Sequence, residues 1–423
     1  MHILILTLGS RGDVQPYIAL GMGLRAAGYD VTLSSEARFA GFVEQHGLRF
    51  APLRGELLSL LQTPEGKAAL VGKGNPVKLL RQVGPMLRQV LDDEWQIAQE
   101  ADAVIYHPKA LGGHSIAEKL GIPGILALPL PLYSPTRAFP SLLLPFDNLG
   151  GTLNQASHQL TVWLSSVSTS SVLNRWRKEV LDLPPAGDPL TLHGRPLLRL
   201  YGYSPALLPT TGDWAGHSVA TGYWFLDQQA AWQPPPALLA FLRDGPPPVY
   251  IGFGSMPAQD AQANTTLVLE ALERAGQRGV LASGWGGLAA AELPPSVYLL
   301  EEAPHDWLFP QMAAVVHHGG AGTTAAGLRA GVPTVICPFF GDQPFWGRRV
   351  AALGAGPQPI PQRRLTAARL AEAIRNAVGD PAIRQRAAAL GDTIRAEDGV
   401  ARAVKLIEQE VDSHKSKSRS VTV

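Results

Sequence analysis

The sequence contains a single cysteine, Cys337, among 423 residues, and its charges nearly cancel, with 36 Lys and Arg against 35 Asp and Glu. One cysteine excludes an intramolecular disulfide and any metal site built from several cysteines. The charge balance argues against a nucleic-acid binder, which needs a basic surface. The near absence of cysteine fits a reducing, cytoplasmic compartment. The lack of an excess of basic residues removes nucleic acid from the expected partners.

The start of the sequence lacks a long hydrophobic run. The apolar stretch at 2–8 is far shorter than a membrane span. A signal peptide would carry a basic segment before a longer apolar stretch, and this sequence has neither. At the other end, residues 415–423 carry three basic side chains, Lys415, Lys417 and Arg419. Because three charges make a weak lipid anchor, we expect a solvated tail, with peripheral contact to anionic membrane lipid as the alternative.

Apolar residues are plentiful, at 46% of the chain against 17% charged, so a large core can form and the length favours two domains. Strand-like apolar stretches alternate with helical patterns twice along the chain, which is typical of parallel sheets with helices on both faces. The first set of expected strands is 3–6, 31–33, 48–52, 103–106 and 124–127, and the second set is 249–253, 280–282, 297–300, 313–316 and 333–337.

The predicted fold is therefore α/β, with two Rossmann-like, doubly wound domains that face each other across a cleft. We expect the first domain at 1–215 and the second at 216–398, with the proline-rich stretch 216–246 as the linker region. Residues 399–423 are expected to form a C-terminal helix and the basic tail.

The strongest local signal is the sequence HHGGAGTT at 317–324, between an expected strand and an expected helix that begins at Thr323. Glycines allow a phosphate to approach the backbone, and a helix N-terminus offers unpaired N–H groups and a positive dipole end. His318 and Thr323 add side-chain donors, whereas His317 is expected to pack at the strand end. The alternative is an ordinary tight turn in which Thr323 caps the helix.

Two further loops of the second domain carry polar side chains. The sequence GFGS at 252–255 also follows a strand and can direct the Ser255 hydroxyl at the same anion. The sequence FFGDQP at 339–344 places Asp342 beside Gln343, a pair able to hydrogen-bond several hydroxyls of one sugar. The alternative is that Asp342 caps a helix that starts near Pro344.

These motifs together resemble the GT-B glycosyltransferases of family 1. HHGGAGTTAAG at 317–327, PFFGDQPFW at 338–346 and ATGYWF at 220–225 are most similar to its sterol glucosyltransferase branch. GSRGDVQP at 9–16 resembles that branch and also the glycosyltransferases of glycopeptide antibiotics. The resemblance implies that the first domain binds an acceptor and the second a nucleotide-sugar donor. It also implies that the helical segment 400–412 crosses back onto the first domain.

The resemblance also implies roles for particular residues. The donor is expected to be UDP-glucose, with a dTDP-sugar as the alternative, and no cofactor is expected. In the plant-type signature an acid contacts the ribose, but its position here is Ala326, which leaves that hydroxyl unassigned. The implied donor contacts are Trp285 and Ala303 for the base, Ser255, His318, Gly320, Gly322 and Thr323 for the diphosphate, Ser10, Arg11 and Gly12 from the opposite side of the cleft, and Asp342 and Gln343 for the sugar.

Asp13 occupies the position at which other family members carry a histidine base, so the resemblance implies that it is the general base of an inverting transfer. An aspartate has an ordinary pKa of ~3.9, and we expect burial in the cleft to raise it. His107, at the end of the strand 103–106, is expected to pair with Asp13. The alternatives are that Asp13 only caps a helix from Pro16 and that His107 only packs at its strand end.

No metal is expected, because the sequence has no Asp-x-Asp motif and no cluster of metal ligands at a suitable spacing. The acceptor pocket is expected in the irregular stretch after residue 128, where apolar and aromatic side chains suit a sterol, a hopanoid-like lipid, a polyketide or a phenol. The alternative is that those side chains belong to the core. The residues concerned are Leu132, Tyr133, Phe139 and Phe146.

Two other functions remain as alternatives. A dinucleotide-dependent oxidoreductase needs Gly-x-Gly-x-x-Gly after the first strand, and the turn at 9–12 lacks the middle glycine. A non-catalytic protein that binds a nucleotide sugar or a lipid is the second alternative. The joint presence of Asp13, His318 and Asp342 argues against it.

Overall fold

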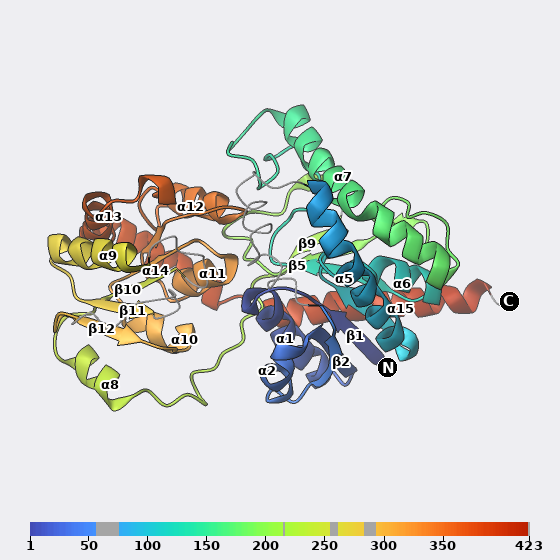
Figure 1. The fold of residues 1–423 in the computed structure, drawn as a ribbon, viewed down its shortest axis with the longest axis horizontal. Coiled ribbons are helices and arrows are strands. Elements are labelled where there is room, and N and C mark those ends of the chain that lie inside the picture. The colour runs from blue at the N-terminus through green and yellow to red at the C-terminus, as the bar shows by residue number, and fades with distance from the viewer. Residues whose placement is uncertain (56–75, 215, 254–260, 283–292, 422–423) are drawn as a thin grey trace.

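The chain forms two parallel sheets, each in its own half of the molecule (Figure 1). The computed structural model describes residues 1–55, 76–214, 216–253, 261–282 and 293–421. The first sheet has seven strands in the order β3-β2-β1-β4-β5-β8-β9, and the second has five in the order β12-β11-β10-β13-β14. In both sheets the strand order reverses beside the first strand, which is the topological switch point at which α/β folds bind ligands.

The inner strands of the first sheet are short and almost fully buried, whereas the edge strand β3 is buried only at Leu53. In β1 the four residues after His2 are buried, and Ile3 lies opposite Val31 of β2 on one side and Ala103 of β4 on the other. Such continuous apolar runs are what a parallel sheet covered on both faces requires. The strands are β1 His2–Leu6, β2 Asp30–Glu36, β3 Arg49–Leu53, β4 Ala103–Tyr106, β5 Gly124–Leu128, β8 Leu198–Tyr201 and β9 Ser218–Ala220; a separate pair is β6 Thr191–Leu192 and β7 Arg195–Pro196.

Helices of the first half are α1 Arg11–Ala26, α2 Ala40–Glu44, α5 Pro76–Ile97, α6 Gly113–Leu120 and α7 Gly151–Trp176. The second half contains β10 Val249–Gly252, β11 Gly279–Ala282, β12 Val297–Leu300, β13 Ala314–His317 and β14 Thr334–Ile336. Its helices are α8 Pro236–Arg243, α9 Ala261–Ala275, α10 His305–Leu308, α11 Ala321–Arg329, α12 Gln343–Ala352, α13 Ala367–Gly379 and α14 Pro381–Arg395.

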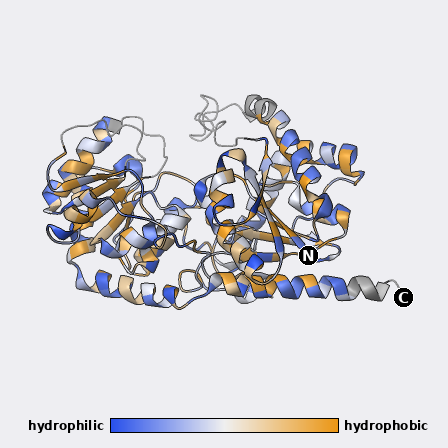
Figure 2. Cartoon of the chain, turned by 90° about the horizontal axis from the view of Figure 1, so that it is seen from below, coloured by the Kyte–Doolittle hydropathy of each residue, from blue (hydrophilic) through white to orange (hydrophobic). Residues whose placement is uncertain are grey.

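The last helix, α15 (Gly399–Val421), leaves the second half and packs on the first. Ala403, Ile407 and Val411 are buried in the same cluster as Ile3 of β1. Figure 2 shows α15, which ends at the label C, with hydrophobic and hydrophilic residues alternating along it. The expectation that the C-terminal helix crosses back onto the first domain is therefore confirmed.

Three details differ from the sequence predictions. The helix expected from residue 16 begins at Arg11, because Ser10 takes the N-cap position immediately after the glycine turn. Strand β9 pairs with β8, so the first sheet continues beyond residue 215, where we expected its domain to end. The expected linker region contains both β9 and α8 and so is not a simple connection.

Candidate active site

Asp13 lies in the first turn of α1, at the carboxyl end of β1. Its Oδ2 accepts hydrogen bonds from the backbone N–H of Ser10 at 2.8 Å and from the Ser10 hydroxyl at 3.0 Å. Gly9 has φ +129°, and a Cβ there would lie 2.4 Å from this oxygen, so only glycine allows the carboxylate to fold back over the turn. Asp13 therefore does help to cap a helix, although the helix begins at Arg11 and only one carboxylate oxygen is used.

The other oxygen of Asp13 faces two residues that follow β4. Lys109 Nζ lies 2.7 Å from Asp13 Oδ1, and His107 Nε2 lies 3.9 Å from the same atom. His107 Nδ1 accepts a hydrogen bond from the Lys109 backbone N–H at 3.1 Å, so the neutral ring carries its proton on Nε2, on the side of Asp13. Burial lowers the pKa of His107 to about 4, which keeps the ring neutral near pH 7. The structure thus brings the expected Asp13–His107 pair together at 3.9 Å.

The pKa of Asp13 differs from the expectation. Burial acts to raise it, but the charge of Lys109, followed by His107 and the hydrogen bonds to the carboxylate, outweighs burial and lowers the pKa below its ordinary value. The expected upward shift is therefore wrong, because a cation sits in hydrogen-bond contact with the carboxylate. Sequence reasoning missed Lys109. Lys109 could have been found from its position two residues after His107, because the residues that follow β4 and those that follow β1 lie at the same edge of the sheet.

The glycine-rich loop lies at the start of α11. The helix has Gly320 at the N-cap position and begins at Ala321, two residues earlier than expected. The first backbone N–H groups of a helix have no partner within it, and here they belong to Ala321, Gly322 and Thr323. Gly319 has φ +91°, which turns the chain from β13 into the helix. The loop thus presents three amide donors and the positive end of the helix dipole, as an anion site requires.

The two histidines of this loop have different environments. His317 is fully buried, and its Nδ1 accepts a hydrogen bond from the Gly319 N–H at 2.9 Å, so it packs at the strand end as expected. His318 lies over the loop, since a Cβ on Gly320 would come within 2.6 Å of its Nε2. Within the described part of the chain its Nδ1 has no hydrogen-bond partner, and burial lowers its pKa to about 4. His318 is therefore a neutral ring.

Asp342 and Gln343 stand at the start of α12. Asp342 is at the N-cap position, but its Oδ2 accepts a hydrogen bond from Trp346 Nε1 at 2.8 Å and not from a backbone N–H of the first turn. Gln343 Oε1 accepts hydrogen bonds from the N–H groups of Phe339 and Phe340 at 2.8 and 3.3 Å. The amide oxygen thus holds the loop in shape, which the sequence did not indicate.

Charged residues of the first half act on the pKa of Asp342 in the second half. Burial raises the pKa of Asp342, and the negative charge of Asp13 adds to this, while Lys109 acts in the opposite direction. These residues come from α1, from the end of β4 and from α12. The catalytic role of Asp13 and the sugar-binding role of Asp342 stay predictions.

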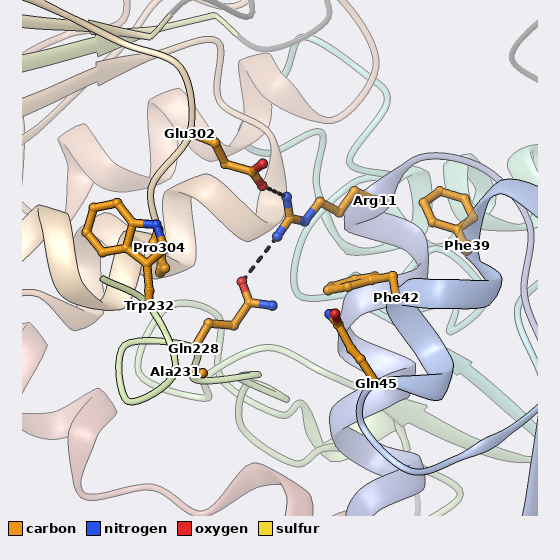
Figure 3. Close-up of a pocket in the computed structure, with 9 residues that line it drawn as sticks. All are labelled: Arg11, Phe39, Phe42, Gln45, Gln228, Ala231, Trp232, Glu302 and Pro304. Atoms are coloured by element: carbon orange, nitrogen blue, oxygen red, sulfur yellow. Dashed lines mark hydrogen bonds and ion pairs between the residues drawn. The ribbon is translucent and has the colours of Figure 1, made fainter. Parts of the chain in front are cut away.

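Arg11 crosses between the halves at a hollow of about 560 Å³ (Figure 3). Its guanidinium pairs with Glu302 of the second half and donates to Gln228 Oε1 at 3.1 Å, and it lies 4.9 Å from the centre of the Phe42 ring. Arg11 thus reaches the second half, and contact of Ser10, Arg11 and Gly12 with a donor stays a prediction. In this arrangement, however, the charge of Arg11 is paired with a carboxylate.

Ala303 lies between two residues that line the hollow, Glu302 and Pro304, and its side chain packs in a cluster with Ala326. The base-binding role of Ala303 stays a prediction. Ser255 and Trp285, expected for the diphosphate and the base, lie outside the described residues.

The expected acceptor residues separate into two groups. Leu132, Tyr133 and Phe139 pack against the core of the first half, as the alternative interpretation held. Phe146 is 52% exposed, on the segment that precedes α7. Contact of any of the four with an acceptor stays a prediction.

Two family models match the chain. The model "Glycosyltransferase family 28 N-terminal domain" matches residues 3–139, and "Erythromycin biosynthesis protein CIII-like, C-terminal domain" matches residues 284–409. The first covers the β1–α1 turn with Asp13 and Lys109, and the second covers His318 and Asp342. The two matches thus fall on the two halves that supply the site.

Similar proteins include sterol 3-beta-glucosyltransferases of plants and fungi. The enzyme UGT80A2 of Arabidopsis thaliana is 39% identical over 427 residues, covering 98% of this chain and 66% of the relative. UGT80B1 of the same plant is 39% identical over 417 residues, covering 96% of this chain and 67% of the relative. The protein of Neosartorya fischeri is 38% identical over 441 residues, covering 100% and 30%. The chain thus spans about two thirds of the plant relatives and less than a third of the fungal one.

Solved structures of antibiotic glycosyltransferases have the same fold. The glycosyltransferase of kitacinnamycin superimposes with a TM-score of 0.71 at 23% identity, covering 97% of this chain and 99% of that one. The calicheamicin glycosyltransferase CalG4 superimposes with a TM-score of 0.66 at 19% identity, covering 97% and 98%. The predicted fold, two Rossmann-like domains in the GT-B arrangement, is therefore confirmed.

Proposed function

The chain belongs to the glycosyltransferase family of the sterol 3-beta-glucosyltransferases, and we propose that it transfers glucose from UDP-glucose to a hydroxyl of a lipophilic acceptor, with inversion at the anomeric carbon. The observation that carries the proposal is the position of Asp13 at the carboxyl end of β1, where Lys109 Nζ lies 2.7 Å and His107 Nε2 3.9 Å from its Oδ1. Asp13 comes two residues after Arg11, which pairs with Glu302 of the second half. A base for such a transfer must lie where the first half faces the half that binds the donor.

In the proposed reaction, Asp13 Oδ1 accepts the proton of the acceptor hydroxyl. The acceptor oxygen forms a bond to the anomeric carbon as the bond from that carbon to the diphosphate oxygen breaks, and the electron pair leaves with UDP. Oδ2 accepts hydrogen bonds from Ser10, which fix the orientation of the carboxylate while Oδ1 accepts the proton. His107 points its Nε2 proton towards the Asp13 carboxylate from 3.9 Å, which is too far for a hydrogen bond in this arrangement.

The second half supplies the site for the leaving group. Negative charge on the diphosphate develops against the amide groups at the start of α11 and the donor proton of the neutral His318 ring. Asp342 and Gln343 bind the hydroxyls of the glucose. This arrangement neutralises the leaving group by backbone dipoles, so the proposed transfer requires no metal.

Lys109 sets the working pKa of the base. An acceptor hydroxyl that reaches Oδ1 competes with Lys109 for that oxygen. Loss of the lysine contact would allow burial to raise the pKa of Asp13, so the carboxylate becomes a better base when acceptor is bound.

The test measures UDP release from UDP-glucose with and without a panel of sterols, polyketides and phenols, in parallel with dTDP-glucose. Acceptor-dependent release of UDP supports the proposal. Turnover of dTDP-glucose alone would keep the transferase and replace the donor. Binding of either nucleotide sugar without turnover of any acceptor would instead indicate the non-catalytic alternative.

A further inference from the structure

The exposed apolar side chains of the described residues are concentrated on one segment, from residue 143 to the middle of α7. Seven of the eight large hydrophobic residues recorded as exposed lie in this segment. On α7 they recur at 153, 160, 163, 164 and 167, a spacing that places them on one face of the helix. The seven are Leu143, Phe146, Leu153, Leu160, Trp163, Leu164 and Val167, with exposures of 49% to 61%.

This apolar face of α7 is unusual because the helix has no charged residue between Gly151 and Asn174. Its polar residues over this stretch are Ser, Thr, Asn, Gln and His. Amphipathic helices that bind anionic membranes carry Lys and Arg, whereas those that sense loosely packed lipid bind through their apolar side chains. A partner that recognises α7 must therefore do so without charge.

Several hydroxyl groups of α7 are already paired within the helix. Ser166, Ser168 and Ser170 each donate to a backbone carbonyl of the preceding turn at 2.9 Å. Such bonds satisfy the hydroxyl donor without water or a partner, so this surface can be desolvated at little cost in lost hydrogen bonds. A protein partner would offer donors and acceptors that these groups no longer need, whereas hydrocarbon offers none.

The opposite side of α7 holds the segment expected to bind the acceptor. His158 Nε2 is 3.0 Å from the Phe139 carbonyl oxygen, and the Ser165 hydroxyl is hydrogen-bonded to Tyr133. The segment before the helix also reaches the second half, because Arg348 pairs with Asp147 at 2.8 Å. Helix α7 thus lies between the apolar face and the segment expected to bind the acceptor, and Figure 1 shows this helix at the outer edge of the first half.

We propose that the uncharged apolar face of α7 docks on a neutral lipid bilayer, into which Leu160, Trp163 and Leu164 insert. The helix lies on the surface, since none of the helices in the described ranges is long and apolar enough to cross a membrane. Because this face of α7 carries no charge, its binding depends on gaps between lipid headgroups. Small, highly curved vesicles should therefore bind more protein than large vesicles. If the proposed function holds, the bilayer that α7 contacts is the source of the lipophilic acceptor.

The test is flotation of the full chain with phosphatidylcholine vesicles, in the absence of donor and acceptor. We expect binding that is stronger to small vesicles and insensitive to salt. Replacing Leu160, Trp163 and Leu164 by serine should lower the partition coefficient by at least about tenfold, since three large apolar side chains no longer enter lipid. The matched control, L160M/W163F/L164M, keeps the apolar area and should bind like the wild type.

All three residues are more than half exposed, so the serine variant should fold, which circular dichroism and unchanged binding of a nucleotide sugar verify. The proposal would be overturned if the wild type failed to float, or if the serine variant floated equally well. It would also be overturned if binding required anionic lipid and disappeared in salt. A wild-type dimer that the serine variant abolishes would assign the face to a second copy instead. Because flotation needs no turnover, its failure is distinct from failure of the proposed function.

Discussion

Lys109 Nζ lies 2.7 Å from Asp13 Oδ1, in a contact between the ends of two neighbouring strands of the first sheet. This contact decides the charge of the proposed base, because burial alone would raise the pKa of Asp13 and the lysine reverses the shift. Asp13 is therefore ionised well below neutral pH. The proposed base is ready to accept a proton over the whole physiological range.

Removal of the lysine charge should move the acid limb of the pH–rate profile. Activity requires ionised Asp13, so kcat/KM falls as the pH drops through the pKa of that group. In Lys109→Met burial is no longer outweighed, and we expect the acid limb to move up by about one pH unit. Lys109→Arg keeps the charge and should leave the limb near its wild-type position. An unchanged profile in Lys109→Met would contradict this role.

Glycine at position 9 should be required for the position of the carboxylate. Its φ is +129°, and a Cβ there would meet Asp13 Oδ2 at 2.4 Å, so Gly9→Ala should lower kcat while changing the KM for donor little. Gly28→Ala is the matched control, because Gly28 has φ +91° but no atom within 4 Å of the added Cβ. Both should lose roughly 1–2 kcal/mol of stability to backbone strain, measured by urea unfolding. Equal loss of kcat in both would show that strain alone is responsible.

Stability should fall in mild acid. Burial lowers the pKa of His107, His305 and His318 to about 4, below the ordinary histidine value of ~6.5. The unfolded chain binds protons at these positions as the pH falls below about 6.5, whereas the folded chain does not until near pH 4. Each group should thus reduce the free energy of unfolding by about 1.4 kcal/mol per pH unit in that window. His318→Gln should flatten the slope of urea-unfolding free energy against pH, and an unaltered slope would contradict the buried, neutral state of His318.

The sequence predicted most of the fold because the strands of both sheets are apolar runs that end at glycine or polar turns. Strand boundaries such as 103–106 and 297–300 agree with β4 and β12. Strands β8 and β9 were not predicted, since both are short and follow a long helical segment without the strand–turn–helix pattern. Because β9 was not predicted, the expected end of the first domain at residue 215 leaves out a strand of its sheet.

The sequence indicated single residues of the candidate site but not the contacts between residues that are distant in the chain. Asp13, His107, His318 and Asp342 stand at strand or helix ends, where local motifs indicate polar function. The contact of Asp13 with Lys109 joins residues 96 positions apart, and no local pattern contains it. The direction of the Asp13 pKa shift depends on that contact and was wrong for this reason.

The most direct test of the proposed mechanism compares Asp13→Asn with the wild type. Asparagine retains an oxygen for the hydrogen bonds from Ser10 but cannot accept the acceptor proton at a carboxylate. We predict that kcat for acceptor-dependent UDP release falls by about 10²–10⁴-fold while UDP-glucose binding, measured by calorimetry, is unchanged. An Asp13→Asn enzyme that turns over at the wild-type rate would contradict the assignment of Asp13 as the base.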